Sequence, residues 1–187
     1  MESRLDVEQQ GPAETIGPRE LLVFDTSPLT HFARQSWLGA LKAVVGERPA
    51  LIPDVVVDEL QQIAARDSRV EAVLSAEWIE KRELREAREI KAFAEFSALL
   101  VRGERNKGEA GVLALASTVG GIAVVDDGAG RKVAQKYGIQ LKPTLALLCE
   151  AIRKDLLTVA LVSALVDDLL ASEYRLPFQP GGFAQWA

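Results

Sequence analysis

The chain has 187 residues, of which 48% are hydrophobic and 26% charged, a balance typical of a globular domain with one substantial core. Its 22 basic and 27 acidic residues give a net charge of -5, which excludes binding of polyanions through overall positive charge, although clustered metal-binding carboxylates would account for much of the excess. No apolar segment approaches the ~20 residues of a membrane span and no signal peptide is recognisable, so we expect a cytoplasmic protein without a membrane partner.

Three regions are expected along the chain. Residues 1–18 are polar and lack apolar periodicity, which predicts a flexible N-terminal extension. Residues 19–172 alternate between apolar runs and helical patterns, which predicts one folded domain. Residues 173–187 are rich in proline, glycine and aromatic side chains, and we expect a C-terminal tail without regular structure.

The first expected element is a strand at Leu21–Phe24, because an uninterrupted apolar run is typical of a strand buried on both faces of a parallel sheet. Asp25 stands at the end of this strand, where open α/β sheets bind their ligands. Helical spacing of apolar residues then predicts one helix over 28–45, which Gly46 ends.

Strands and helices continue to alternate after this helix. Short strands are expected at 50–52, 77–84, 122–125 and 139–141, and helices at 54–65, 69–75, 85–101, 106–116, 131–137, 144–154 and 159–171. In the helix over 85–101 we expect Ile90, Phe93, Ala94 and Leu100 to face inward. Such alternation requires right-handed crossovers, so the predicted fold is a three-layer α/β/α architecture with a central, mainly parallel sheet.

Acidic side chains recur where these strands end and the next helices begin. Asp25 follows the first strand, and Asp126 and Asp127 follow the strand at 122–125. Glu59 lies one turn into the helix after the second strand, and Glu109 lies near the start of a helix of small residues. At one sheet edge these carboxylates would suit Mg²⁺ or Mn²⁺, which prefer oxygen ligands. Hydrolysis of a phosphodiester is the chemistry that suits such a site.

Each of these acids also has a structural interpretation. Asp25 is placed to cap the following helix, Glu59 to lie on a solvated helix face, and Glu109 to complement a helix dipole. Asp126 and Asp127 precede Gly128 and fit a turn. Only their joint occurrence in this order favours the functional interpretation.

Neighbouring polar residues are candidates for contact with the substrate. Thr26 and Ser27 would position water or substrate, and Arg131 would meet a phosphate, although helix capping and an exposed helix face explain them almost as well. The sole histidine, His31, and the sole cysteine, Cys149, are expected to be structural. Their scarcity disfavours a zinc site and a cysteine or serine nucleophile paired with histidine.

Four short segments resemble the PIN-domain family and are most similar to the VapC-type toxin ribonucleases. The segments occur in the family's order, at residues 23–29, 52–60, 107–116 and 124–134. The resemblance implies that residues 19–172 form a PIN-like domain, and that the chain is a Mg²⁺- or Mn²⁺-dependent endoribonuclease with an RNA substrate. It also implies frequent homodimers and, for toxins, an antitoxin partner.

The same resemblance assigns roles to individual residues. It implies a catalytic, metal-binding set of Asp25, Glu59, Glu109 and Asp126, with Asp127 as a fifth metal ligand. Val125 stands where the family usually has a polar residue, which leaves open which of the two following aspartates binds the metal.

Other functions remain open at this point. A PIN-like module that binds RNA or protein without cleaving it would retain the same acids. A phosphatase of the haloacid dehalogenase type would need a second aspartate where Ser27 stands, and a nicotinamide-dependent enzyme would need a glycine-rich loop after the first strand. The resemblance alone favours RNA over DNA.

Overall fold

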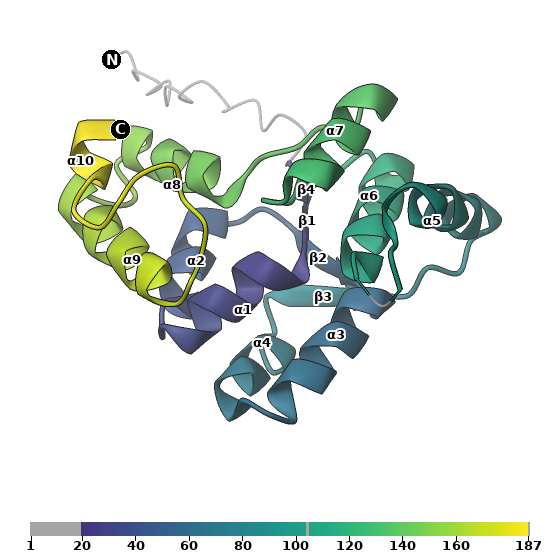
Figure 1. Ribbon diagram of the computed structural model, residues 1–187, viewed down its shortest axis with the longest axis horizontal. Helices are drawn as coiled ribbons and strands as arrows, with labels where there is room; N and C mark the ends of the chain where they lie inside the picture. Colours follow the sequence, from purple (N-terminus) through teal and green to yellow (C-terminus); the bar gives the residue numbers. More distant parts are fainter. Residues whose placement is uncertain (1–19, 104, 187) are drawn as a thin grey trace, which may run out of the picture.

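A parallel sheet forms the centre of the computed structural model, which describes residues 20–103 and 105–186 (Figure 1). The strands are β1 (Leu22–Phe24), β2 (Ala50–Pro53), β3 (Ile79–Arg82) and β4 (Ile122–Val124). Their order within the described residues is β3-β2-β1-β4, and every neighbouring pair is parallel. The ends of β1 and β4 therefore lie side by side, as the predicted acidic site requires.

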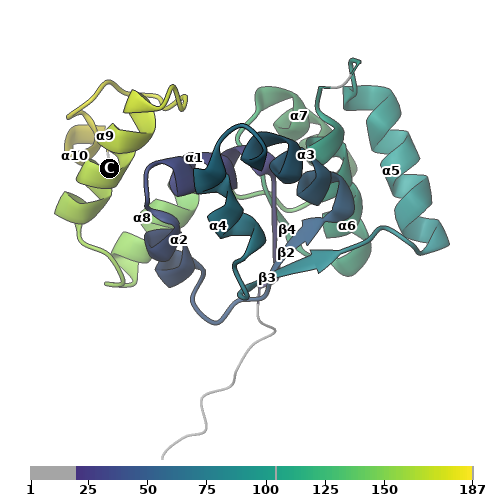
Figure 2. The same cartoon turned by 90° about the horizontal axis from the view of Figure 1, so that it is seen from below.

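Helices cover both faces of this sheet, which confirms the three-layer α/β/α architecture (Figures 1 and 2). The helices are α1 (Thr26–Arg34), α2 (Leu38–Val45), α3 (Asp54–Ala64), α4 (Glu71–Leu74), α5 (Ala87–Leu100), α6 (Lys107–Val119), α7 (Gly128–Tyr137), α8 (Thr144–Arg153), α9 (Val159–Ala171) and α10 (Phe183–Trp186), with a 3-10 turn, η1 (Ser68–Val70). Helices α5, α6 and α7 lie on one side, and α1, α2, α8 and α9 on the other (Figures 1 and 2). No helix in the described part of the chain is long and apolar enough to cross a membrane.

Helix α6 is the closest helix to the sheet because it is built from small residues. It contacts β1, β2 and β4, and its first ten residues include a buried run from Gly108 to Ala116. At Gly111 an added Cβ would overlap the side chain of Val55, so only glycine permits this close packing against α3. The resulting approach brings the N-terminus of α6 to the ends of the strands.

Two expected elements differ in the structure. The predicted helix over 28–45 is two helices, because Ser36 adopts a φ of 60° and the chain turns before Trp37. The Trp37 indole then donates a hydrogen bond to Asp168 of α9 at 2.8 Å, a contact 131 residues away in sequence. The strand expected at 139–141 is only a single bridge between Leu141 and Ala123.

The inward face of α5 also differs from the prediction. Ile90 is 53% exposed and Ala94 is exposed, whereas Phe96 and Leu100 are buried as well as the charged Glu89. Glu89 belongs to a capping box that fixes where the helix begins. The buried face of α5 therefore includes Glu89, which a pattern of apolar residues does not predict.

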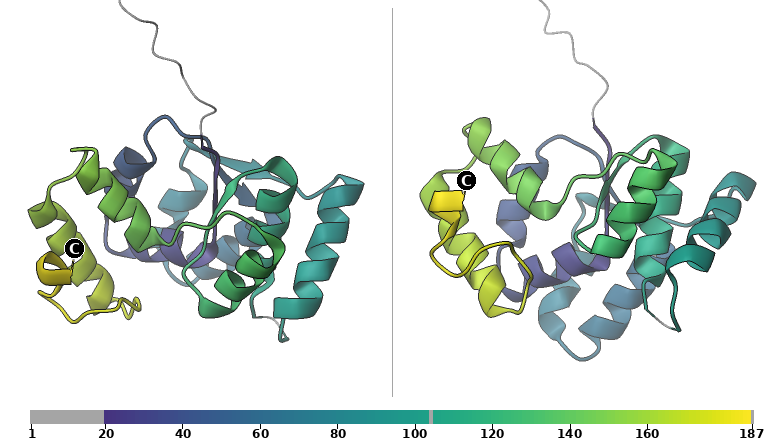
Figure 3. Two further views of the ribbon diagram at one scale, coloured as in Figure 1. Left: turned by 90° about the horizontal axis from the view of Figure 1, so that it is seen from above. Right: turned by 45° about the horizontal axis from the view of Figure 1, so that its top comes forward.

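The C-terminal residues return to the domain after α9. Tyr174 is 6% exposed and Phe183 is fully buried, and Phe183 begins the short helix α10, where no regular structure was expected (Figure 3). The segment after α9 returns to α1, where the ring of Tyr174 lies 4.8 Å from that of His31. The N-terminal extension expected at residues 1–18 lies outside the described residues.

Candidate active site

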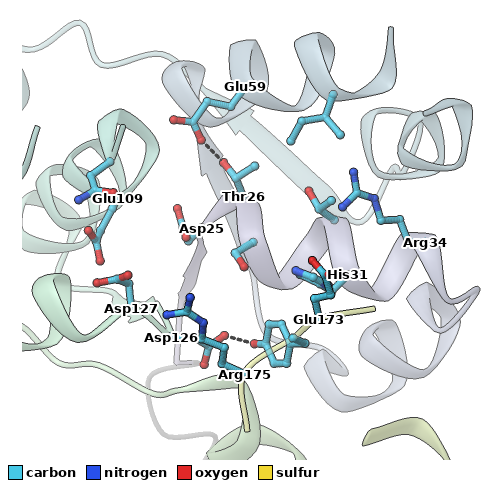
Figure 4. A pocket seen from close by; sticks show the side chains of 15 residues that line it. Asp25, Thr26, His31, Arg34, Glu59, Glu109, Asp126, Asp127, Glu173 and Arg175 are labelled. Carbon is cyan, nitrogen blue, oxygen red and sulfur yellow. Dashed lines mark hydrogen bonds between the residues drawn. The ribbon is translucent and has the colours of Figure 1, made fainter. Parts of the chain in front are cut away.

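A cavity of about 570 Å³ opens beside the carboxyl ends of β1 and β4. The predicted acids line it together: Asp25, Glu59, Glu109, Asp126 and Asp127 (Figure 4). Thr26 and Ser27 also line the cavity, whereas Arg131 is not among the lining residues. The topology has thus brought together acids that, apart from the adjacent Asp126 and Asp127, are 17 to 102 residues apart in the chain.

Asp25 lies at the floor of this cavity, directly after β1. It occupies the N-cap position of α1, but its side chain makes no capping hydrogen bond, so capping does not account for it. Burial, together with the nearby charges of Glu59 and Asp126, raises its pKa to about 7, although backbone N–H groups at the start of α1 lower it. A carboxylate held this way gains from a neighbouring cation.

Glu109 is the most buried acid of the site, with 4% of its surface exposed. Its Oε1 accepts a hydrogen bond from the backbone N–H of Gly130 at 2.9 Å, while Oε2 is buried without a hydrogen-bond partner in the described part of the chain. Burial and the charges of Asp25 and Asp127 raise its pKa to about 7. An added Cβ at Gly130 would overlap Oε1, so glycine is required for this approach.

Glu59 is held on the opposite side of the cavity by donors from two other elements. Its Oε1 accepts from the backbone N–H of Gly108 at 2.8 Å, and its Oε2 accepts a short hydrogen bond from the Thr26 hydroxyl (Figure 4). A Cβ at Gly108 would overlap that carboxylate. Thr26 therefore positions Glu59, and neither residue is explained by helix capping or a solvated helix face.

Asp126 and Asp127 are used differently although they are adjacent. Asp126 accepts from the backbone N–H and hydroxyl of Thr144, at 2.9 and 2.7 Å, and from the hydroxyl of Tyr174. Asp127 caps α7 through the backbone N–H of Ala129 at 2.6 Å. Its carboxylate lies beside those of Asp25 and Glu109 (Figure 4). Asp126 is thus oriented by protein donors and its charge raises the pKa of Asp25, whereas the charge of Asp127 raises the pKa of Glu109.

Tyr174 and Thr144 are site residues that were not predicted. Burial raises the pKa of Tyr174 well above its ordinary value, and the neighbouring Asp126 carboxylate raises it further, so the phenol remains a donor. Forty-eight residues separate Tyr174 from Asp126, and no local pattern marks the pairing. Thr144 is the first residue of α8, whose N-cap is Pro143, and its hydroxyl donates to Asp126 instead of capping the helix.

Positive side chains complete the lining of the cavity. Arg34 and Arg175 face it from α1 and from the segment after α9 (Figure 4). Arg131, expected to meet substrate, donates instead to the backbone carbonyl of Asp126 at 3.0 Å. His31, expected to be structural, lines the cavity, and its Nδ1 lies 2.8 Å from the Ser172 hydroxyl.

The donor set fits a hard divalent cation. Its groups are carboxylates, one of them has a buried oxygen without a partner among the described residues, and two have raised pKa values because they are buried and lie near other negative charges. As the side chains stand, no three His, Cys, Asp or Glu residues of the described chain are grouped closely enough to hold a metal ion. Glu59 and Asp126 both accept hydrogen bonds from protein donors.

Comparisons with known proteins bear on this site. A family model, DUF3368, described as a PIN domain, matches residues 21–179 of the chain. The crystal structure of VapBC2 from Rickettsia felis, bound to a DNA fragment from their promoter, is similar at 14% sequence identity. The similarity covers 66% of this chain and 98% of that chain, with a TM-score of 0.48. No curated protein matches the chain.

Proposed function

Because this chain belongs to the PIN-domain family, whose members are generally nucleases, we propose that it is a divalent-metal-dependent endoribonuclease. The observation that carries the proposal is the pair formed by Asp25 and Glu109. Both have a pKa raised to about 7, and Glu109 has a buried oxygen with no partner in the described part of the chain. A structural role would leave neither group in that state.

In this proposal Asp25, Glu109 and Asp127 hold Mg²⁺ or Mn²⁺, and Glu59 and Asp126 complete the acidic set. When bound, the cation lowers the pKa of water and offsets charge on the leaving oxygen. The chain's own donors prepare the site, because Thr26 fixes Glu59 while Thr144 and Tyr174 fix Asp126. Ser27 is exposed at the start of α1, where it is available to substrate.

The test compares cleavage of structured RNAs in Mn²⁺ by the wild type, Asp25→Asn and Glu109→Gln. Glu89→Gln is the matched control, since Glu89 is also buried in the first turn of a helix but lies outside the cavity. We expect cleavage by the wild type and the control only. Cleavage by the wild type no faster than by the two site variants would contradict the proposal.

Two further arms of this experiment refine the outcome. A single-stranded DNA of the same sequence tests whether RNA is preferred. Calorimetric titration with Mn²⁺ tests the metal site independently of turnover, and metal binding without cleavage would identify a PIN-like binding module instead of an enzyme.

The toxin role, the antitoxin partner and the homodimer implied by the resemblance stay predictions. Light scattering of the purified chain tests the dimer. Induced expression in a bacterial host tests the toxin role. Expression of a toxic wild type arrests growth, whereas expression of the Glu109→Gln variant does not. Growth unaffected by the wild type would contradict that role while leaving nuclease activity to the assay above.

A further inference from the structure

A second hollow of about 460 Å³ adjoins the acidic cavity. The two share Arg34, Glu59, Ile63 and Asn106 in their linings, so they form one continuous groove. The second hollow is also lined by Arg66 and Arg105. One half of the groove therefore carries six carboxylates, and the other half carries guanidinium groups from three separate parts of the chain.

Arg34 stands where the two halves meet, and its side chain is held in place. Its Nε donates to Asp67 at 2.9 Å, and Asp67 is held in turn by Arg69 at 2.8 Å. The hydrogen bonds to Arg69 and Arg34 lower the pKa of Asp67 to about 2, so this anchor stays charged. Neither terminal nitrogen of Arg34 donates a hydrogen bond within residues 20–103 and 105–186, and both remain available to a ligand.

The other arginines of this hollow differ from those near the start of α5. Arg85 and Arg88 are each paired with a glutamate beside them, at 2.6 and 2.7 Å. Arg66 and Arg105 are exposed and make no ion pair with the described residues. Their positive charge is thus not neutralised within the described part of the protein.

We propose that this arginine-lined hollow binds the sugar–phosphate backbone of the strand being cut, with Arg34 on the phosphate next to the reacting one. The inference rests on the proposed nuclease function. Carboxylates repel every phosphate that is not bridged by metal, so a strand leaving the cavity is stabilised where guanidinium groups begin. With its Nε engaged by Asp67, Arg34 presents its two terminal nitrogens in the fixed geometry that suits phosphate oxygens.

The test measures binding without cleavage. Fluorescein-labelled single-stranded RNA of mixed sequence is titrated with the full chain carrying Glu109→Gln, in Mg²⁺, and anisotropy is recorded from 50 to 300 mM KCl, about the range over which phosphate contacts are resolved. In this background Arg34→Gln and Arg66→Gln are compared with Arg88→Gln. Arg88 is the matched control because its Nε also donates to a carboxylate, Glu86, at 2.7 Å.

We expect Arg34→Gln to weaken binding about three- to tenfold and to reduce the slope of log K against log salt by about 0.7, the value for one phosphate contact on a single strand. Arg66→Gln should do the same to a smaller extent, and Arg88→Gln should change neither quantity. Equal slopes for Arg34→Gln and Arg88→Gln, or no RNA binding by the parent, would overturn the inference. Failure of the nuclease proposal is seen separately, as absence of cleavage by the wild type.

Discussion

Two buried glutamates at the same helical position have opposite chemistry. Glu89 and Glu109 each occupy the third residue of a helix, α5 and α6, and these helices pack against each other. Burial raises the pKa of Glu89, but the backbone N–H groups of Glu86 and Arg85 and the charge of Arg82 outweigh it and leave the pKa below its ordinary value. Glu109 has one backbone donor, two negative neighbours and a pKa of about 7.

The difference separates a structural acid from a functional one. Both oxygens of Glu89 are engaged, with Arg82 at 3.1 Å and two backbone N–H groups at 3.0 Å. Glu109 has an oxygen with no partner in the described chain, and the negative charges of Asp25 and Asp127 lie close to it. Burial alone therefore says little about a carboxylate, whereas the balance of donors and like charges predicts its role.

The largest expected effect is on catalysis, and it tests whether Glu109 and Glu89 differ in role. Replacement Glu109→Gln should reduce RNA cleavage at least about a hundredfold, because loss of a ligand exceeds the 10- to 100-fold cost of losing an outer partner. Glu89→Gln should leave cleavage within about twofold of the wild type, as the side chain lies outside the cavity. Initial rates in Mn²⁺ provide the measurement, and similar losses in both variants would show that the two acids do not differ in role.

The next effect is on pH dependence, where the two acids should have opposite signs. The folded pKa of Glu109 lies above its ordinary value of 4.5. The stability contributed by its protonation is therefore fully present below pH 4.5 and is lost as the pH rises through about 7. The stability lost is roughly 3 kcal/mol. Glu89, with a lowered pKa, contributes stability that is lost as pH falls. Urea unfolding without metal from pH 4 to 8 should show that Glu109→Gln removes much of the decline toward neutral pH, and added Mn²⁺ should restore stability to the wild type.

Loss of the structural acid should cost somewhat less. Glu89→Ala removes the capping box and leaves two backbone N–H groups and Arg82 without their partner, so the free energy of unfolding should fall by about 2 kcal/mol. Glu95→Ala, an exposed glutamate on the same helix, is the control and should change it by less than about 0.5 kcal/mol. If Glu89→Ala lowered the free energy of unfolding no more than the control does, Glu89 would not be a structural acid.

Tyr174→Phe tests whether the hydrogen bond that orients Asp126 contributes to metal binding. The hydroxyl donates to Asp126, so its loss should weaken Mn²⁺ binding roughly tenfold. The melting temperature should change little, because the ring keeps its contact with His31. Calorimetry provides the affinity, and Tyr137→Phe, on a ring that is 45% exposed, is the control. Unchanged affinity would show that Asp126 needs no such donor.

The smallest effect concerns Ile90, the neighbour of Glu89. The apolar pattern predicted that it faces inward, but it is 53% exposed. Ile90→Gln should therefore change the free energy of unfolding by less than about 0.5 kcal/mol, whereas Phe96→Ala should cost about 3 kcal/mol or more. A large loss of unfolding free energy for Ile90→Gln, measured by urea unfolding, would show that Ile90 belongs to the core.

Much of the scaffold of the site was predictable because it depends on local patterns. Buried apolar runs marked β1 and β4, and helix 159–171 matches α9 in both its ends. Since parallel strands end at one edge, the acids that follow them were expected to meet, and the structure places them around one cavity. Local pattern and topology were sufficient for this much.

The partners of these acids were not predictable for the opposite reason. Thr26 engages Glu59 across 33 residues and Tyr174 engages Asp126 across 48. Single hydroxyl groups at such separations leave no period in the sequence. The turn at Ser36 was missed likewise, because its unusual φ accompanies a contact of Trp37 with Asp168 on a distant helix. Non-local contacts selected these conformations over the local preference.

The separation between Asp126 and Tyr174 also has a consequence in time. A ribosome adds the intervening 48 residues in roughly 2 to 10 seconds. During that interval a nascent chain already contains the five predicted acids but lacks the phenol that orients Asp126. In the ribonuclease proposed above, the predicted acids would therefore be synthesised before the donor that orients Asp126.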